Sequence, residues 1–347
     1  MADAGLKLAH YSGFAKIAAR WHGGAGVFLK FEHVRPMRPG AFQPLKSNEI
    51  TPKFLDRAVR ALKRSKYDFV SIDEALARAQ GQPQPRRFVC LTFDGGHKDF
   101  IANAYPVLSK HNVPFAVYVP TAFIDGIGQA WWLALEKIVA QHSRIGLMIG
   151  DVENYFSAAS VDDKYQVFDL LYGWLRNLSP PEREVAVNDL CSRYGVPIAD
   201  VSRNMSMNWD DIAKLARDPL ATIASATVNY PNLSATKGGT VSREMAMGRT
   251  VLESALGREC RHFAYPFGDR ESFGARDILL AREAGFISAL SSVSVVVREG
   301  GHSDFLSLPR IAWDGRRKST AALRAVMSGL GMPRERLIQP DEDTNYG

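Results

Sequence analysis

The feature of this 347-residue sequence that most restricts its fold is the alternation of short apolar segments with longer amphipathic ones. Apolar residues recur at helical spacing over 131–142, 242–256 and 276–284. Near-continuous apolar runs, typical of buried strands, lie at 27–31, 88–93, 115–119, 222–228, 262–267, 286–290 and 306–311, and 293–297 is expected to add an edge strand. Strands that alternate with helices predict a mainly parallel sheet, and this number of units favours a (β/α) barrel.

The boundaries of the helices are marked by capping residues, and one long segment breaks the alternation. Thr51 before Pro52 is a helix start, and Gly257 and Gly285 are typical helix ends. The segment 143–207 contains further helix starts but lacks the alternation of strands with helices. We therefore expect a helical insertion packed beside the barrel. We therefore divide the chain as follows: a 1–26 N-terminal extension, a 27–330 barrel that includes the insertion, and a 331–347 polar tail.

The composition is that of a globular protein. Hydrophobic residues make up 46% of the chain, and a net charge of +6 is too mild to argue for a nucleic-acid partner. The three cysteines are widely spaced and odd in number, which argues against a disulfide framework. Neither a secretory signal nor an apolar run of about 18 residues, the length of a membrane span, is present in the sequence. We expect a cytoplasmic protein of unspecified oligomeric state.

Three runs of residues near predicted strand ends carry the functional signal. Leu-Thr-Phe-Asp-Gly-Gly-His lies at 91–97, Ser-Ala-Thr-Val-Asn-Tyr-Pro at 225–231, and His-Phe-Ala-Tyr-Pro-Phe-Gly at 262–268. With Phe-Glu-His-Val at 31–34 and Leu-Pro-Arg-Ile at 308–311, they resemble the signatures of the polysaccharide deacetylase family. The resemblance extends from about 27 to about 325 and implies a distorted (β/α) barrel, with site residues at the C-terminal ends of the strands.

The same resemblance indicates that the family's metal ligands are substituted. The family has a second Asp in the first run and two His in the second, whereas this chain has Gly95, Ala226 and Tyr230. Catalytic zinc sites use about three protein ligands plus a water. The sequence therefore predicts that no metal cofactor is bound. We expect Gly95→Asp, Ala226→His and Tyr230→His together to restore zinc binding.

The resemblance also assigns two catalytic positions. Asp94 matches the family's catalytic base, and Arg261 matches the arginine that orients it, so we expect an ion pair between them. No histidine after Leu308 matches the family's late catalytic acid. Asp94 has either a structural role or a ligand-binding role. The candidates for substrate binding are His33, His97, Tyr230, Tyr265 and Arg310.

Three of the candidate positions have more than one interpretation. His97 either contacts substrate or rebuilds a metal site with Asp94 and Asp99. Tyr230 either fills the space of the lost metal or contacts a sugar. One member of the Trp131–Trp132 pair is expected to stack on a sugar ring, and at least one to be core.

Two functions follow from these residues. We favour a catalytically impaired pseudoenzyme that binds an oligosaccharide or polysaccharide. The alternative is an active carbohydrate deacetylase that removes N-acetyl or O-acetyl groups from a polysaccharide or chitooligosaccharide with an altered site.

Overall fold

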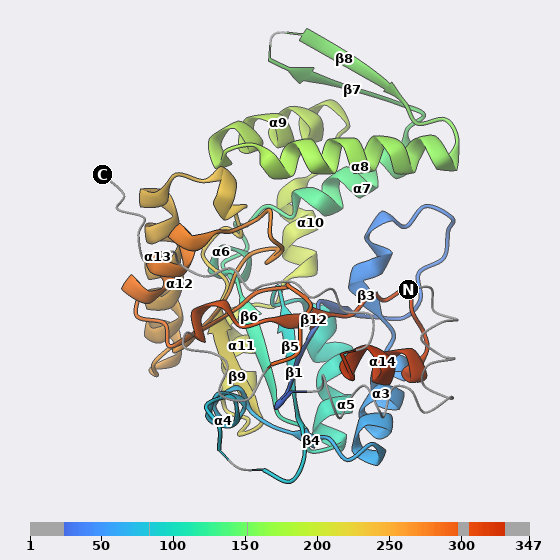
Figure 1. The fold of residues 1–347 in the computed structure, drawn as a ribbon. Helices are drawn as coiled ribbons and strands as arrows, with labels where there is room; N and C mark the ends of the chain where they lie inside the picture. Colours follow the sequence, from blue (N-terminus) through green and yellow to red (C-terminus); the bar gives the residue numbers. More distant parts are fainter. Residues whose placement is uncertain (1–23, 83, 151, 298–304, 330–347) are drawn as a thin grey trace.

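The computed structural model describes residues 24–82, 84–150, 152–297 and 305–329. Its centre is an eight-stranded sheet in the order β11-β10-β9-β6-β5-β1-β12, with β4 beside β5 (Figure 1). Every pairing between these strands is parallel. The strands are β1 (Gly26–Phe31), β4 (Asp68–Phe69), β5 (Phe88–Asp94), β6 (Phe115–Val119), β9 (Ala221–Ser225), β10 (His262–Ala264), β11 (Ser288–Leu290) and β12 (Arg310–Ala312).

The sheet curls into a nearly closed barrel, as the sequence predicted. The two ends of the strand order meet where Leu290 forms a parallel bridge with Leu308. The amide of Ser291 also donates to the carbonyl of Leu308 at 2.8 Å. The order of strands and this contact confirm the (β/α) barrel.

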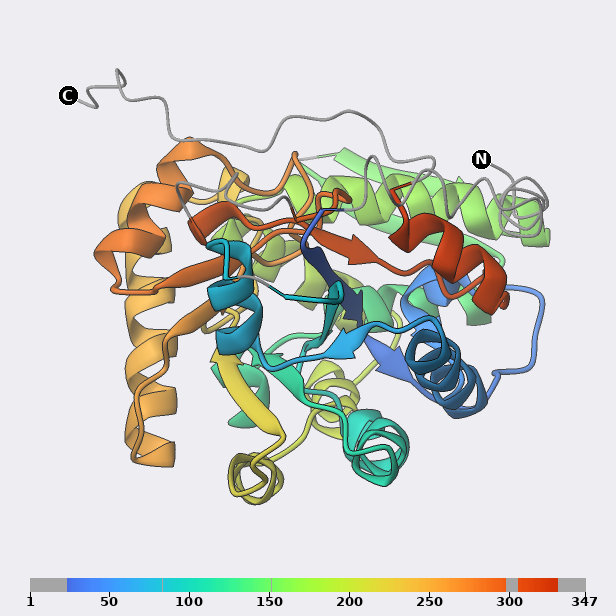
Figure 2. The same cartoon turned by 60° about the horizontal axis from the view of Figure 1, so that its bottom comes forward.

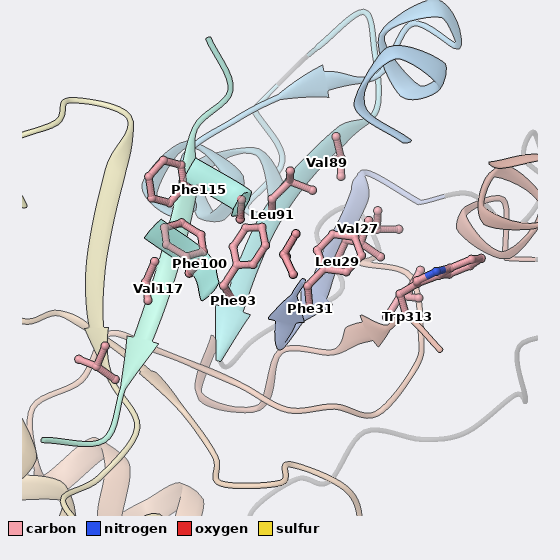
Figure 3. Packing of buried hydrophobic residues seen from close by; sticks show 14 of the residues in the cluster. Val27, Leu29, Phe31, Val89, Leu91, Phe93, Phe100, Phe115, Val117 and Trp313 are labelled. Carbon is pink, nitrogen blue, oxygen red and sulfur yellow. The ribbon is translucent and has the colours of Figure 1, made fainter. Parts of the chain in front are cut away.

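Alternation along each strand divides the core into two layers. Val27, Leu29 and Phe31 of β1 pack with alternate residues of β5 and β6 on the outer face of the sheet (Figure 3). Phe28 belongs to the layer inside the barrel. Because side chains alternate between the faces of a strand, Lys30 lies on the inner face with Phe28. The same alternation places Asp94 on the inner face.

Helices surround the barrel, with α12 and α13 together on one side and α3 and α14 together on another (Figure 2). The Thr51 hydroxyl accepts from the amide of Phe54, as expected of a helix cap. Gly257 ends α12 in a left-handed conformation. The helices are α3 (Pro52–Arg64), α4 (Ile72–Ala79), α5 (Tyr105–Lys110), α6 (Thr121–Ile124), α7 (Trp131–Gln141), α11 (Trp209–Ala216), α12 (Gly238–Leu256), α13 (Ala275–Glu283) and α14 (Thr320–Met327).

The short elements lie in the connections. Strand β2 (His33–Val34) pairs in parallel with β3 (Glu49–Ile50). The remaining short helices are η1 (Pro44–Asn48), η2 (Phe100–Ala104), η3 (Leu233–Ala235) and η4 (Phe305–Ser307). In the part of the chain that the structure describes, no helix has the length and apolar character needed to cross a membrane.

The insertion is only partly helical, which corrects the prediction for 143–207. It begins with an antiparallel hairpin of β7 (Arg144–Ile149) and β8 (Val152–Ser157), above the helices in Figure 1. Ile145 and Leu147 are buried while Arg144 and Met148 are exposed, so the alternation typical of a half-buried strand was present in the sequence but was not recognised. Helices α8 (Val161–Asn177), α9 (Pro180–Arg193) and α10 (Ile198–Met205) follow and share a core with α7.

The predicted strands at 222–228, 262–267, 286–290 and 306–311 are longer than the observed β9, β10, β11 and β12. Strand β9 ends at Ser225 because Thr227 and Tyr230 take positive φ angles, 69° and 55°, which a strand does not allow. The expected edge strand at 293–297 is not a named strand, and Val297 forms an isolated bridge with Gly26. Most of the expected N-terminal extension and all of the tail lie outside the described residues.

Candidate functional site

A cleft of about 590 Å³, including its open mouth, lies at the C-terminal ends of β1 and β5. It lies between the barrel and the insertion, since both supply lining residues. Aromatic side chains form much of its wall, and Glu32 and Asp94 are the carboxylates on it. The lining residues are Glu32, His33, Leu45, Asn48, Asp94, Gly95, His97, Pro120, Phe123, Trp132, Tyr172, Met205, Tyr230 and Phe267.

Asp94 is the buried carboxylate at the base of this cleft. Its oxygens accept from Nη1 and Nη2 of Arg310 at 2.6 and 2.8 Å. Arg310 is fully buried on β12, and its Nε donates to the carbonyl of Ser291 at 2.8 Å. Such a two-point contact fixes both planar groups. Arg310 lies behind Asp94 and is not among the lining residues, so its predicted contact with substrate would require movement.

Lys30 supplies a second positive charge to the same centre. Its ammonium lies 3.2 Å from Asp94 and 3.0 Å from Glu32, and donates to the hydroxyl of Ser292 at 3.2 Å. These three contacts use all three of its donors. The side chain is only 5% exposed, so it is buried with two carboxylates and one other cation. Lys30, Arg310, Asp94 and Glu32 together form an ionic centre with no net charge.

The electrostatics of the centre keep Asp94 and Lys30 ionised. Burial alone would raise the pKa of Asp94, but Arg310 and Lys30 outweigh burial and lower it. Burial alone would lower the pKa of Lys30, but Glu32 and Asp94 outweigh burial and raise it. The carboxylate and the ammonium therefore remain charged through the neutral pH range.

Arg261 is not the partner of Asp94, which corrects the sequence-based prediction. It precedes β10, at the end of the barrel opposite the cleft. Its guanidinium pairs with Asp73 at 3.1 Å, and both side chains are about half exposed. The prediction failed because the matched run identified an arginine near β10, whereas the one that reaches Asp94 comes from β12.

The loop after β9 holds Tyr230 in the cleft through a network of hydrogen bonds. Glu244 of α12 accepts from the amides of Val228 and Asn229 at 3.0 and 2.8 Å. The Tyr230 amide donates to the Thr227 hydroxyl at 3.1 Å. A Cβ on Gly248 would lie 2.8 Å from the carbonyl carbon of Thr227, so glycine allows this loop to approach α12.

The Tyr230 phenol has a defined place in the cleft wall. Its oxygen accepts from the amide of Phe267 at 3.2 Å, and its ring contacts those of Phe267 and Trp132. Burial raises the pKa of Tyr230 to about 12. Thr227, Tyr230 and Phe267 all have positive φ angles. Such strain in non-glycine residues is typical of binding and catalytic sites.

Two imidazoles stack on the other wall. The rings of His33 and His97 lie 3.9 Å apart and nearly parallel, and Nδ1 of His33 lies 2.8 Å from Asp99. Burial lowers the pKa of both histidines well below 6.5, with Arg35 adding to the effect at His33. His33 is therefore neutral near pH 7, and its Nδ1–H donates to Asp99.

The structure also gives the positions of the tryptophan pair and of Tyr265. Trp131 is 3% exposed in the core that the insertion shares with α7, so one of the pair is a core residue as expected, and Trp132 lines the cleft. Tyr265 is fully buried, donates to the carbonyl of Leu306 at 2.6 Å and stacks on Phe273. It is absent from the lining, so its predicted substrate contact is not supported by its position.

Comparison with known proteins decides the family. A family model described as "Polysaccharide deacetylase" matches residues 81–148 and 168–286, more than half of the chain. The chain belongs to the polysaccharide deacetylase family. A search of curated proteins gave no match.

Solved structures of several deacetylases share the fold. The Streptococcus pyogenes deacetylase PplD, solved with acetate, is 16% identical with a TM-score of 0.58 and covers 87% of this chain and 97% of its own. IcaB from Ammonifex degensii is 17% identical with a TM-score of 0.56, covering 88% and 98%. A de-N-acetylase from Aggregatibacter actinomycetemcomitans is 14% identical with a TM-score of 0.56, covering 86% and 98%. At these identities the likeness establishes the fold alone.

The metal expected of a polysaccharide deacetylase does not fit the residues at this site. Among the described residues, no group of three His, Cys, Asp or Glu side chains is placed to hold a metal ion. Gly95 has a φ of +100°, and a Cβ there would lie 2.2 Å from Nε2 of His97. The His97 ring therefore occupies the space into which a ligand at position 95 would extend. His97 also stacks on His33 rather than joining Asp94 and Asp99 around an ion.

Sequence reasoning missed Lys30 and Glu32 in this member of the polysaccharide deacetylase family. Both lie within or just after the apolar run of β1, where a charge is costly unless it is paired. A lysine between Leu29 and Phe31 was therefore a signal for a buried counter-charge. Nothing in the sequence named its partners, because they come from β5 and from the residues after β11.

Proposed function

We propose that this polysaccharide deacetylase family member binds a glycan in its cleft and does not carry out metal-dependent deacetylation. The observation that carries the proposal is the ionic centre around Asp94. In this centre Lys30 and Arg310 already compensate the carboxylate that would otherwise serve as base. A base held by two cations has a lowered pKa and is poorly suited to accept a proton.

The form of the cleft supports glycan binding. Trp132, Tyr172 and Tyr230 present aromatic surface of the kind that packs against the apolar face of a sugar ring. Glu32, His33 and Asn48 place polar groups on the same lining. A mostly apolar pocket with a few polar groups is the usual form of a small-molecule site.

Metal analysis and an acetate-release assay test this proposal together. The purified full chain, incubated with zinc and then desalted, is expected to retain well under one equivalent by elemental analysis. Acetate release from chitooligosaccharides should equal that of the Asp94→Asn variant, and a chelator should change neither rate. Stoichiometric zinc with chelator-sensitive acetate release would contradict the proposal.

A second candidate function is hydrolysis without a metal. It is favoured by the Asp99–His33 pair, in which the Nδ1–H of the imidazole donates to the carboxylate while the ring lines the cleft. This is how a carboxylate orients a histidine that acts as general base. Acetate release that persists in chelator and is lost in His33→Gln would favour this candidate, with an O-acetylated substrate as the more reactive probe.

A further inference from the structure

The described lining of the cleft has acceptors and aromatic rings but no cation. Its lining contains Glu32, Asp94 and two neutral imidazoles, and none of its described lining residues is Lys or Arg. The cations of the ionic centre lie behind the lining, and their donors are directed at Asp94, Glu32, Ser291 and Ser292. A carboxylate, sulfate or phosphate on a ligand would therefore meet no free positive charge among the described lining residues.

Glu32 is the acceptor that remains open to a ligand. One oxygen, Oε1, lies 3.0 Å from Lys30, and within the described residues the second oxygen has no protein partner. Its side chain is 24% exposed, against 2% for Asp94, whose two oxygens are both held by Arg310. A ligand group that donates hydrogen bonds is therefore matched at Glu32, and a carbonyl oxygen is not.

The aromatic wall adds to this preference. Trp132, Tyr172 and Tyr230 line the same cleft as Glu32. Cations are attracted to the faces of such rings, and rings combined with a carboxylate form a typical ammonium site. Hydroxyl groups would also be satisfied there, but an ammonium gains from both the carboxylate and the rings.

We infer that the cleft selects glycans that carry a free amino group over their N-acetylated forms. The inference rests on the proposed function and names the ligand class of the same site. The acetamide of an N-acetyl sugar is neutral and offers Glu32 a single N–H donor beside an apolar methyl and an acceptor oxygen. Replacement of that acetamide by an ammonium gives Glu32 a charged donor. The protein would thus bind the product form of the reaction after which its family is named.

Calorimetric titration of the full chain with three probes tests the inference. The probes are a glucosamine tetramer at a pH where its amines are protonated, an N-acetylglucosamine tetramer and a galacturonic acid tetramer. The amino tetramer is expected to bind at least tenfold more tightly than the acetylated one, and the acidic one not at all. The preference should weaken as salt rises, because it is electrostatic.

Two matched variants locate the preference. Glu32→Gln should lower affinity for the amino tetramer at least tenfold and thereby remove most of its preference over the acetylated tetramer. Glu153 lies on the hairpin, outside the cleft lining, and its carboxylate pairs with Arg193 of α9. Glu153→Gln should change neither affinity. The wild-type comparison of probes stands even if Glu32→Gln fails to fold.

The possible outcomes distinguish failure of the amino-group preference from failure of glycan binding itself. Equal binding of the amino and acetylated tetramers, or tighter binding of the acetylated one, would overturn the inference and leave glycan binding intact. Binding of the acidic tetramer would overturn it as well. Binding of no probe would overturn glycan binding itself and the inference with it.

Discussion

Arg310 holds both carboxylate oxygens of Asp94, at 2.6 and 2.8 Å, although the two residues are 216 positions apart in the chain. The contact joins β12 to β5 across β1, which lies between them. It turns the residue that matches a catalytic base into one half of a buried ion pair, with Lys30 on its other side.

We expect Arg310→Met to destabilise the fold strongly. The variant leaves Asp94 buried with Lys30 as its remaining counter-charge, and loss of one partner of a buried pair costs about 3–5 kcal/mol. Arg261→Met is the matched control, because its pair with Asp73 is about half exposed and should contribute about 1 kcal/mol or less. Urea denaturation of both variants checks this. Equal losses of unfolding free energy would show that the buried pair with Asp94 contributes no more to stability than the exposed pair of Arg261.

We expect the free energy of unfolding to fall as the pH is lowered from neutral toward 5. The folded protein holds the pKa of His33 and His97 well below 6.5, so in this range the unfolded chain binds protons that the folded chain does not. The stability that comes from the neutral rings is complete above about pH 6.5 and declines as the pH approaches the folded pKa. Denaturation at a series of pH values should show a shallower slope for His97→Gln. An identical slope would contradict this account.

We expect Gly95→Asp, Ala226→His and Tyr230→His together not to restore zinc binding, contrary to the expectation from sequence alone. The left-handed backbone at position 95 and the His97 ring both oppose an aspartate there. Lys30 adds a positive charge to the same centre. Calorimetric titration with zinc should show no binding by this triple variant.

Removal of the His97 ring and of the Lys30 charge provides the control for that experiment. Addition of His97→Ala and Lys30→Met to the triple variant should raise zinc affinity at least tenfold, which is about 1.4 kcal/mol. Circular dichroism would confirm that the variant is folded. Tight zinc binding by the triple variant alone would mean that His97 moves aside without cost.

We expect the adjacent tryptophans to give opposite results when each is replaced by alanine. Trp131→Ala should cost about 3–5 kcal/mol of stability, because it leaves a cavity in the core of the insertion. Trp132→Ala should cost less stability and weaken glycan binding roughly tenfold, or about 1.4 kcal/mol, since its ring lines the cleft. Melting curves and glycan titration of both variants check this. Reversed results would place the binding surface elsewhere.

Much of the barrel could be predicted from the sequence, because its strands are buried on both faces. Continuous apolar runs such as 27–31 and 115–119 predict such strands without knowledge of their neighbours. The hairpin of the insertion was not predicted, because its strands are only partly buried and β8 has no fully buried residue. A half-buried strand gives a weaker apolar pattern than a fully buried one.

The sequence by itself determined the family resemblance, the substitutions at positions 95, 226 and 230, and the position of Asp94 at a strand end. Only the tertiary structure decided that Arg310 and Lys30, not Arg261, neutralise that carboxylate. The physical reason is that local pattern fixes which residues form a strand and which face each takes. The partner of a buried charge is set by strand order and register, which bring together residues far apart in the chain.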